Sequence, residues 1–537
     1  MKTYRFYFLF FMLMFVQIRT VPAQDILRIE LDASALNLPY YTIPAGENGL
    51  IVLRGMEIRG RRIIGWEMIH YSTAFRELSR KTFFPERTGS FAGWEKSDSH
   101  VYLLFLYENA GVAGEVVIYD PVSLESAKKT FSFPKQQIRE PVFKAIGEHF
   151  FICGINTMPP DESRTTRRKF RQGKLPSELL FVSGSLNTET VTLTVHNIPD
   201  LIEMAWVQPD PDGLALLLAL RISGEKFTMD LRTVRFTPAS PELVTLFTLP
   251  SPPEMYLIDL SFLRTGRSGI AVAGTYGTRD RQSWKRGDPV LSEGLFFAQH
   301  ASGTEMAIRF YPFTSFKNLP SSIMQAYLKR SRTTGRNQPG KGQIAYRMLL
   351  HEQAYSLNGN MVLVGEAFYP EYEYENRPQS AFYYPYGYSP WYGGYYPGFY
   401  DTGGRWVFKG FRYEHAIVAA FDSLGNLTWE NSFETSNILD KNLNERLSLL
   451  AYENEIVLVY AHDGKVWFRI IRDNDVVVDK ESYPVEMLSP ADRVREHLSM
   501  NMTRWYNQYF LVWGRQVIRG ADGRSRTVYY CNKLAFE

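Results

Sequence analysis

Residues 415–433 read HAIVAAFDSLGNLTWENSF, the pattern of two short apolar strands joined by a tight turn. The turn, Ser423–Asn426, contains Gly and Asn, which tolerate the positive φ that hairpin turns need. Two further apolar stretches, Ala345–Tyr355 and Met361–Phe368, precede this hairpin. Residues 344–433 are therefore predicted to form a unit of four short β-strands, with a long insertion between the second and the third.

The composition is that of a folded, strand-rich protein. Of the 537 residues, 45% are hydrophobic, 22% are charged and 15% are aromatic. This supplies ample material for a core, and the aromatic content favours the half-buried surfaces of sheets. Because all-β propellers and barrels run long as single domains, the length does not require several domains.

The same unit recurs along the chain, which is the mark of a repeat fold. Its recurring phrase is an apolar strand that opens on Gly or a polar residue and often ends on Gly. The phrase occurs at Gly49–Gly55, His100–Leu106, His149–Gly154, Gly213–Leu220, Gly269–Gly274, Asn360–Gly365, Glu455–Tyr460 and Gln508–Gly514. We therefore predict an all-β, eight-bladed β-propeller; seven blades are the alternative, because the strands near residues 86–98 and 140–146 are weak.

The two ends of the chain complement each other. The last unit lacks a fourth strand because the sequence ends at Glu537, whereas Ile26–Leu31 is a strand without a unit of its own. Pairing of the N-terminal strand with the last blade would close the ring and remove exposed sheet edges. We expect this closure.

The sixth unit resembles the repeat of the bacterial PQQ-like (WD40-like) propeller superfamily. In that repeat a strand ending in an aromatic-Asp pair turns through Gly into a Trp strand; here the matching residues are Phe421, Asp422, Gly425 and Trp429. The resemblance implies a propeller over residues 24–537 and a packing role for Trp429 between blades. Its motifs are structural, so it implies no catalytic residue.

The N-terminus has the features of a signal peptide. A basic start with Lys2 and Arg5 precedes the apolar run Phe6–Val16, and Val21–Ala23 places small residues before a cut ahead of Gln24. The run is too short to span a bilayer, which needs about 20 residues; a retained anchor is the alternative. The ending resembles Bacteroidetes signal peptides, so residues 1–23 predict an exported protein of the periplasm, outer membrane or cell surface.

The two cysteines are Cys153 and Cys531. Export would permit a disulfide. The repeat scheme nevertheless places them in well-separated blades, so we expect two buried free thiols.

Most long loops are predicted to share one face of the propeller. In an antiparallel blade, the connections between strands two and three and the links between blades leave from the same edge. The insertions at 156–176, 276–291, 314–342 and 369–411 all fall on that edge. Long loops on a rigid scaffold commonly carry function.

The insertions are of two chemical kinds. One kind is basic, and its candidate binding residues are Arg164, Arg167, Arg168, Lys169, Arg171, Lys329, Arg330 and Arg332. With a net charge of only +3, this concentration predicts a polarised molecule with an acidic partner, such as an envelope protein or an anionic glycan or lipid. Solvated loops without a partner are the alternative.

The other kind is the uncharged segment Phe382–Tyr400, with eleven aromatics in nineteen residues. Such side chains offer large, rigid contact area, and an exposed patch of that size is a liability without a partner. The candidate binding residues are Tyr383, Tyr384, Tyr386, Tyr388, Trp391, Tyr392, Tyr395 and Tyr396. The alternative is a lid folded onto the blade tops or into the centre of the ring.

No recognisable catalytic set is present in the sequence. The nine histidines are scattered without metal-ligand spacing, so no metal or cofactor is expected. A glycosidase needs two facing carboxylates, and the candidates are Asp288, Glu293, Glu366 and Glu414, of which Glu366 is the first to test.

The leading hypothesis is a non-enzymatic, exported binding scaffold, monomeric within a complex and without a nucleic-acid partner. The alternative is a glycoside hydrolase or lyase acting on an acidic polysaccharide.

Overall fold

The computed structural model describes most of the chain between residues 27 and 536. The segments outside the description are 1–26, 35–37, 60–61, 87–88, 108–110, 157–176, 200, 211–214, 224–226, 237–240, 251, 253–254, 266–268, 279–290, 301–307, 315–346, 353, 376–404, 453, 473 and 537. The predicted signal peptide therefore lies outside the described residues. Within them, no helix is long and apolar enough to cross a membrane.

The described residues form eight sheets that follow one another along the chain, and each predicted repeat unit corresponds to one of them. Sheets 1 to 4 consist of β2 (Tyr40–Pro44), β3 (Leu50–Arg59), β4 (Arg62–Tyr71) and β5 (Glu77–Phe83); β6 (Gly89–Lys96), β7 (Val101–Tyr107), β8 (Val112–Tyr119) and β9 (Ser126–Phe133); β10 (Ile138–Ile146), β11 (His149–Asn156), β12 (Ser177–Ser185) and β13 (Thr192–Ile198); and β14 (Leu201–Pro209), β15 (Ala215–Ser223), β16 (Phe227–Phe236) and β17 (Pro241–Pro250). A short 3₁₀ turn, η1 (Gly46–Asn48), joins β2 to β3.

Sheets 5 to 8 continue the series, and the last of them takes its fourth strand from the N-terminus. They consist of β18 (Met255–Thr265), β19 (Gly269–Thr278), β20 (Gly294–His300) and β21 (Ile308–Pro312); β22 (Arg347–Leu350), β23 (Tyr355–Leu357), β24 (Asn360–Glu375), β25 (Arg405–Phe421) and β26 (Leu427–Asp440); β27 (Ser448–Tyr452), β28 (Glu455–His462), β29 (Lys465–Arg472) and β30 (Asp475–Pro484); and β31 (Arg493–Tyr506), β32 (Tyr509–Arg519), β33 (Ser525–Ala535) and β1 (Arg28–Asp32).

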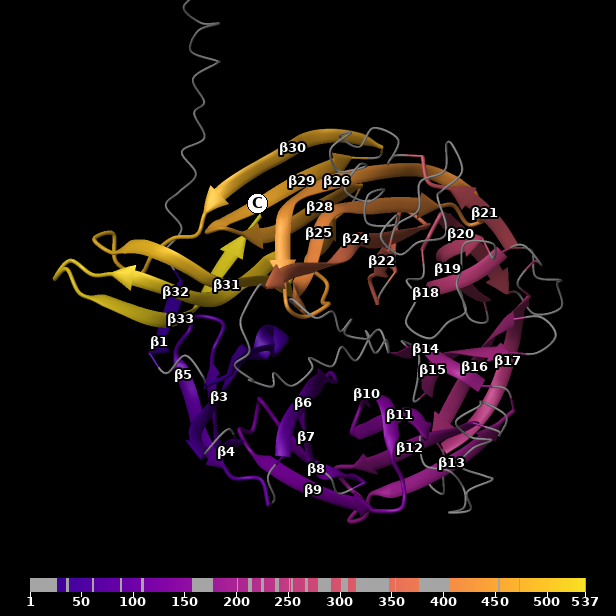
Figure 1. Ribbon diagram of the computed structural model, residues 1–537, viewed down its shortest axis with the longest axis horizontal. Helices are drawn as coiled ribbons and strands as arrows, with labels where there is room; N and C mark the ends of the chain where they lie inside the picture. The colour runs from indigo at the N-terminus through magenta and orange to yellow at the C-terminus, as the bar shows by residue number, and fades with distance from the viewer. Residues whose placement is uncertain are drawn as a thin grey trace, which may run out of the picture.

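The sheets stand side by side around a ring (Figure 1). Eight hydrophobic clusters join successive sheets within the described residues, and the eighth packs Leu50 and Ile69 of sheet 1 against Leu511 and Tyr529 of sheet 8. From sheet 2 to sheet 8, the first strands of successive sheets contact one another, as expected of strands that surround a common axis. The chain is therefore an all-β propeller.

The predicted closure by the N-terminal strand is confirmed. β1 pairs antiparallel with β33 from Arg28↔Asn532 to Asp32↔Val528. The Arg28 guanidinium is buried and donates to Asn532 Oδ1 (3.1 Å) and Gln516 Oε1 (2.9 Å). The two ends of the chain thus share one sheet and one polar network.

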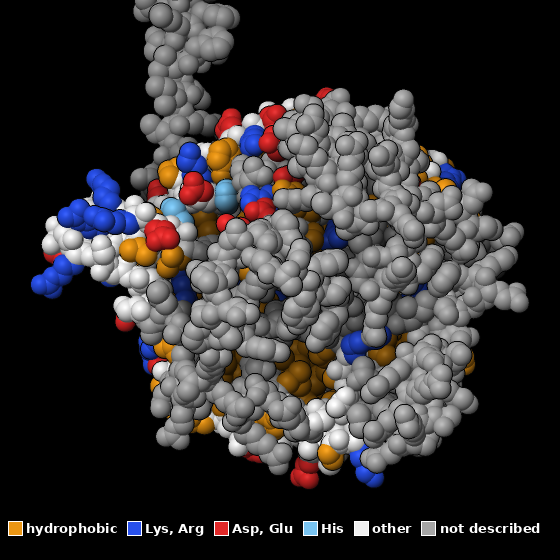
Figure 2. Space-filling view, in the orientation of Figure 1, with side chains coloured by type: hydrophobic (Ala, Val, Ile, Leu, Met, Phe, Trp, Pro, Cys, Tyr) orange, Lys and Arg blue, Asp and Glu red, His pale blue; other side chains and the backbone are white. Residues whose placement is uncertain are grey.

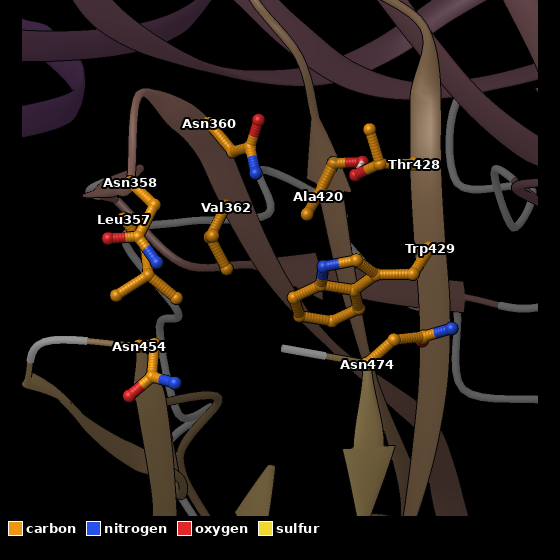
Figure 3. Close-up of a pocket in the computed structure, with 9 residues that line it drawn as sticks. All are labelled: Leu357, Asn358, Asn360, Val362, Ala420, Thr428, Trp429, Asn454 and Asn474. Carbon is orange, nitrogen blue, oxygen red and sulfur yellow. Dashed lines mark hydrogen bonds between the residues drawn. The ribbon is translucent and has the colours of Figure 1, made fainter. Parts of the chain in front are cut away.

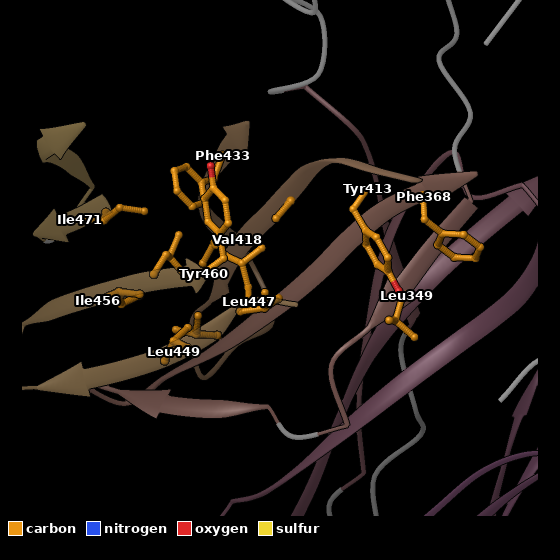
Figure 4. Packing of buried hydrophobic residues seen from close by; sticks show 14 of the residues in the cluster. Leu349, Phe368, Tyr413, Val418, Phe433, Leu447, Leu449, Ile456, Tyr460 and Ile471 are labelled. Carbon is orange, nitrogen blue, oxygen red and sulfur yellow. The ribbon is translucent and has the colours of Figure 1, made fainter. Parts of the chain in front are cut away.

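Alternation of buried side chains explains why the central strands are apolar throughout. In β7, Val101, Leu103 and Phe105 pack towards sheet 1, whereas Tyr102 and Leu104 pack towards sheet 3. Because successive side chains of a strand point to opposite faces, a strand between two neighbours buries both sets. Figure 4 shows the same interdigitation between sheets 6 and 7, where Val418 and Phe433 meet Leu449 and Tyr460.

The free state of both cysteines is confirmed. Cys153 and Cys531 are buried in different sheets. Burial raises the pKa of each thiol to about 12. Neither thiol is therefore ionised at neutral pH, and both pack as small apolar groups.

The ring has two distinct edges. Connections between second and third strands and the links between sheets leave from one edge, here called the insertion edge, because the strands of each sheet alternate in direction. The turns between first and second and between third and fourth strands leave from the other, here called the turn edge. At the turn edge Gly425 has a φ of 79°, as its predicted turn requires.

Candidate functional site

The binding residues predicted from the sequence lie outside the described residues. They occupy segments 157–176, 315–346 and 376–404. The structure describes the strands from which these segments leave, together with three groups of polar residues.

The first feature is a two-stranded arm at the base of the aromatic segment. The predicted insertion 369–411 differs from the structure at both ends, because β24 and β25 remain paired as far as Glu375↔Arg405. β26 pairs with β25 only as far as Phe411, so the two longer strands continue beyond the sheet. Side-chain ion pairs tie the arm together: Lys409–Glu373 and Arg412–Glu371. Residues 376–404 are thus attached to the ring through paired strands.

The second feature is a basic tip on sheet 8, where its strands extend beyond the ring (Figure 1). Its exposed arginines are Arg493, Arg495, Arg519, Arg524 and Arg526. Arg526 pairs with Asp492 (2.9 Å) and Glu30 (3.0 Å), whereas Arg493, Arg495 and Arg519 have no carboxylate partner within the described residues. Figure 2 shows Lys and Arg side chains gathered where sheet 8 projects from the ring. The turn between β32 and β33 belongs to the insertion edge, as the predicted basic loops do.

A third group of charged residues lies at the centre of the ring, and Glu366 is the one member that was a candidate site residue from the sequence. The group forms because the first strand of sheet 6 is interrupted. Leu350 pairs with Gly365, and Tyr355 pairs with Val362. Between these two pairs the chain advances five residues from β22 to β23 but only three along β24. The first strand therefore has two extra residues, which form a bulge. A bulge re-aims the side chains of its strand, and here it contains His351 and Glu352.

Lys144 joins three sheets through this bulge. The buried Lys144, on β10 of sheet 3, contacts Glu352 (3.0 Å) of sheet 6 and Glu95 (3.2 Å) of sheet 2. Burial raises the pKa of Glu95 to about 7, against the attraction of Lys144. Burial alone would lower the pKa of Lys144, but the two carboxylates raise it above its usual value. The contacts therefore keep Lys144 charged and link sheet 6 to sheets 2 and 3, neither of which is its neighbour in the ring.

Glu366 has no exposed surface, and its Oε1 atom is the hub of the group. It accepts hydrogen bonds from His351 Nε2 (2.8 Å) and from the backbone N–H groups of Arg446 (2.8 Å) and Leu447 (3.1 Å). The other ring nitrogen of His351, Nδ1, lies 3.9 Å from Glu445 Oε2. Burial lowers the pKa of His351, but Glu445 and Glu366 raise it by more, so the net shift is upward.

The other candidate carboxylates are buried as well. Glu293 is 2% and Glu414 is 6% exposed, and Glu414 accepts a hydrogen bond from Tyr369 Oη (2.9 Å). Asp288 lies outside the described residues. Among the described residues, no group of three or more His, Cys, Asp or Glu side chains is placed to hold a metal ion.

Replacement of Glu366 by Ala is expected to lower the free energy of unfolding by about 3–5 kcal/mol. The reason is that two backbone N–H groups and one imidazole lose their acceptor in a buried place, at roughly 1–3 kcal/mol for each unsatisfied group. Glu366→Gln keeps a carbonyl acceptor and should lose less than half as much. Urea denaturation followed by circular dichroism measures both, with the exposed Glu77→Ala as control. A Glu366→Ala chain as stable as the parent would show that the carboxylate does not hold the bulge.

Most residues of the central group were not identified as site residues from the sequence. Glu366 was found as a candidate carboxylate, and Lys144 could have been found by the same signal, since each is a charged residue within an otherwise apolar strand (VFKAI and LVGEAF). Glu95, Glu352 and Glu445 carry no such signal, because their partners are distant in the chain.

No protein-family model matches the chain, and no curated protein matches it. Similar solved structures include the polysaccharide lyase Uly1, which is 9% identical, with 83% of this chain and 91% of that chain covered and a TM-score of 0.36. The β-propeller domain of the trilobed protease from Pyrococcus furiosus is 11% identical, with 82% and 97% covered and a TM-score of 0.32.

The WD40 domain of SCAP from fission yeast is 6% identical, with 95% of this chain and 97% of that chain covered and a TM-score of 0.38. Identities and scores this low carry no functional inference. The assignment to the propellers is based on the order of the sheets and on the closed series of clusters between them.

Proposed function

We propose that this protein is an exported, non-enzymatic propeller that binds an acidic partner in the cell envelope through its insertion edge. The observation that carries the proposal is the tip of sheet 8, where five exposed arginines project at the edge from which the basic and aromatic segments also leave. Three of these arginines have no carboxylate partner within the described residues. Unpaired, exposed cations on one side of a molecule attract acidic surfaces and speed their encounter.

The arm formed by β24 and β25 supports the same proposal. Its paired strands join residues 376–404 to the ring. A basic tip and an aromatic segment on one edge would combine electrostatic steering with a desolvated contact, the usual division between rim and centre of an interface.

The central carboxylates favour binding over catalysis. Glu366 is fully buried and its Oε1 atom is occupied by three internal donors, and Glu352 and Glu95 are engaged by Lys144. A general acid or nucleophile has to reach its substrate. We further propose membership of the PQQ-like repeat propellers, on the motif of residues 419–429, and a periplasmic or outer-membrane location, on the predicted signal peptide.

Two variants test the proposed function. Arg519→Glu should weaken capture of the partner from native envelopes roughly fivefold, which corresponds to about 1 kcal/mol, and the effect should shrink in high salt because salt screens exposed charges. Tyr388→Ala, Trp391→Ala and Tyr392→Ala combined should abolish capture. Quantitative pull-down with the mature chain measures both, after each variant has been shown to melt like the parent.

The matched control is Arg76→Glu, an exposed arginine in a turn at the opposite edge of the ring. It should leave capture unchanged. Equal capture by the parent and by both insertion-edge variants would contradict the proposed function. Turnover of an acidic polysaccharide that is lost in a folded Glu366→Gln chain would support the enzyme alternative instead.

A further inference from the structure

A pocket of about 300 Å³ opens at the turn edge, between sheets 6 and 7. It is lined by Leu357, Asn358, Asn360, Val362, Ala420, Thr428, Trp429, Asn454 and Asn474. Figure 3 shows the indole of Trp429 facing across the pocket towards Leu357 and Asn358. The pocket lies on the opposite side of the ring from the insertion edge, so it is separate from the surface of the proposed function.

The floor of the pocket is apolar because of the strand register. Val362 pairs with Ala420, and Ala420 with Trp429, so the three side chains form one row across sheet 6. This row faces sheet 7. Val362 and Ala420 belong to the hydrophobic cluster between sheets 6 and 7, and Trp429 packs against that cluster. Trp429 thus has the packing role that the resemblance implied. It is only partly buried, and its remaining surface is part of the pocket wall.

The rim of the pocket is made of side-chain amides. Asn358 and Asn360 come from the turn into β24, and Asn454 and Asn474 from the turns before β28 and β30. Each amide offers two donors and an acceptor. Within the described part of the chain, these four side-chain amides make no hydrogen bond, and neither does the indole N–H of Trp429. The described lining also contains no charged side chain.

Turn geometry explains only one of these asparagines. Asn358 has a φ of 50° beside Gly359 at 78°, the conformation of an Asn-Gly hairpin turn. Asn360, Asn454 and Asn474 are not among the residues with positive φ. Their residue type is therefore not required by the backbone, and their shared property is that their amides line one pocket.

We propose that this pocket binds a neutral saccharide. A pyranose ring presents a face of C–H groups that packs on an indole, and a rim of hydroxyls that donate and accept at once, as primary amides do. Aromatic side chains with a polar edge suit such amphipathic ligands. The volume lies at the small end of ligand sites, and the absence of charge in the described lining favours a neutral sugar over an acidic one. We expect affinity of order 1 mM, about −4 kcal/mol, for a single sugar unit.

The test is titration of the mature chain with neutral tetrasaccharides of β-linked glucose, mannose and N-acetylglucosamine, followed by saturation-transfer NMR and calorimetry. Binding of at least one of these probes is expected. Trp429→Ala should abolish it, and Asn454→Ala should weaken it roughly tenfold, the effect of about 1.4 kcal/mol. The Asn454 variant is the safer of the two, because its side chain is not part of the core between sheets.

Trp467→Ala is the matched control, since Trp467 packs against the same hydrophobic cluster but does not line the pocket. It should lower stability about as much as Trp429→Ala and leave saccharide binding intact. Three results would overturn the proposal: no binding of any tetrasaccharide, binding that survives both pocket variants, or saturation of the pocket by adenosine in preference to every sugar. Because Arg519→Glu leaves this pocket untouched, failure here and failure of the proposed function are distinguishable.

Discussion

A chain shortened to begin at Ser34 is expected to lose at least about 4 kcal/mol of unfolding free energy relative to a chain that begins at Gln24. Removal of β1 leaves Gln516 and Asn532, 0% and 2% exposed, without the Arg28 guanidinium that they accept from. Unsatisfied buried groups cost roughly 1–3 kcal/mol each, and five paired residues of β33 lose their partner strand. Urea denaturation measures the loss, and light scattering measures the self-association expected of an exposed sheet edge.

Addition of a synthetic peptide of residues 24–33 should restore the lost stability in trans, because strand addition to an open edge uses the same backbone hydrogen bonds. A peptide with Met in place of Arg28 should restore less, since it cannot reach the buried amides. If the shortened chain unfolds at the same urea concentration as the parent, pairing of β1 with β33 contributes nothing to the free energy of unfolding.

Lys144→Met is expected to lower the free energy of unfolding by about 3 kcal/mol. The substitution leaves Glu95 and Glu352 facing each other without a cation, and removal of one partner of a buried pair typically costs about 3–5 kcal/mol. We expect a loss at the lower end of this range, because the side chains of Glu95 and Glu352 are 25% and 31% exposed. The exposed Lys135→Met is the control and should stay within about 0.5 kcal/mol of the parent.

The deficit of the Lys144 variant should depend on pH in a defined direction. Without Lys144, the raised pKa values of Glu95 and Glu352 rise further, so the folded state binds more protons than the unfolded state between about pH 5 and 8. Stability then falls as pH rises through that range, and the deficit is largest at pH 8. Glu95→Gln and Glu352→Gln added together should remove both the deficit and its pH dependence. A deficit that is constant with pH would show that lost packing, not charge, is responsible.

The fold was predictable because its determinants are local. Alternating apolar strands, glycine-led phrases and the unpaired strand at the N-terminus are each visible in a few consecutive residues, and together they predicted the sheets and the closure through β1. The boundaries were less predictable. The predicted strand Ala345–Tyr355 is split by the bulge at His351, and β24 runs to Glu375 rather than to Phe368, because partner strands decide how far pairing continues.

The candidate sites were predictable only in part. Glu366 stood out as a carboxylate within an apolar strand, but its role as a buried acceptor depends on Arg446 and Leu447, which belong to the next repeat. Trp429 was identified as a packing residue, yet its second surface, towards Asn454 and Asn474, depends on how sheet 7 sits beside sheet 6.

By itself, then, the sequence determined the class of fold, the free thiols and the edge from which the insertions leave, since each of these follows from periodicity and chain direction. Only the tertiary structure decided which charges meet at the centre of the ring and which amides surround one indole. Lys144 and Glu352 are 208 residues apart in the chain, and ring closure brings them to 3.0 Å. Short-range patterns carry no information about such distances, because they are set by the packing of every sheet between the two residues.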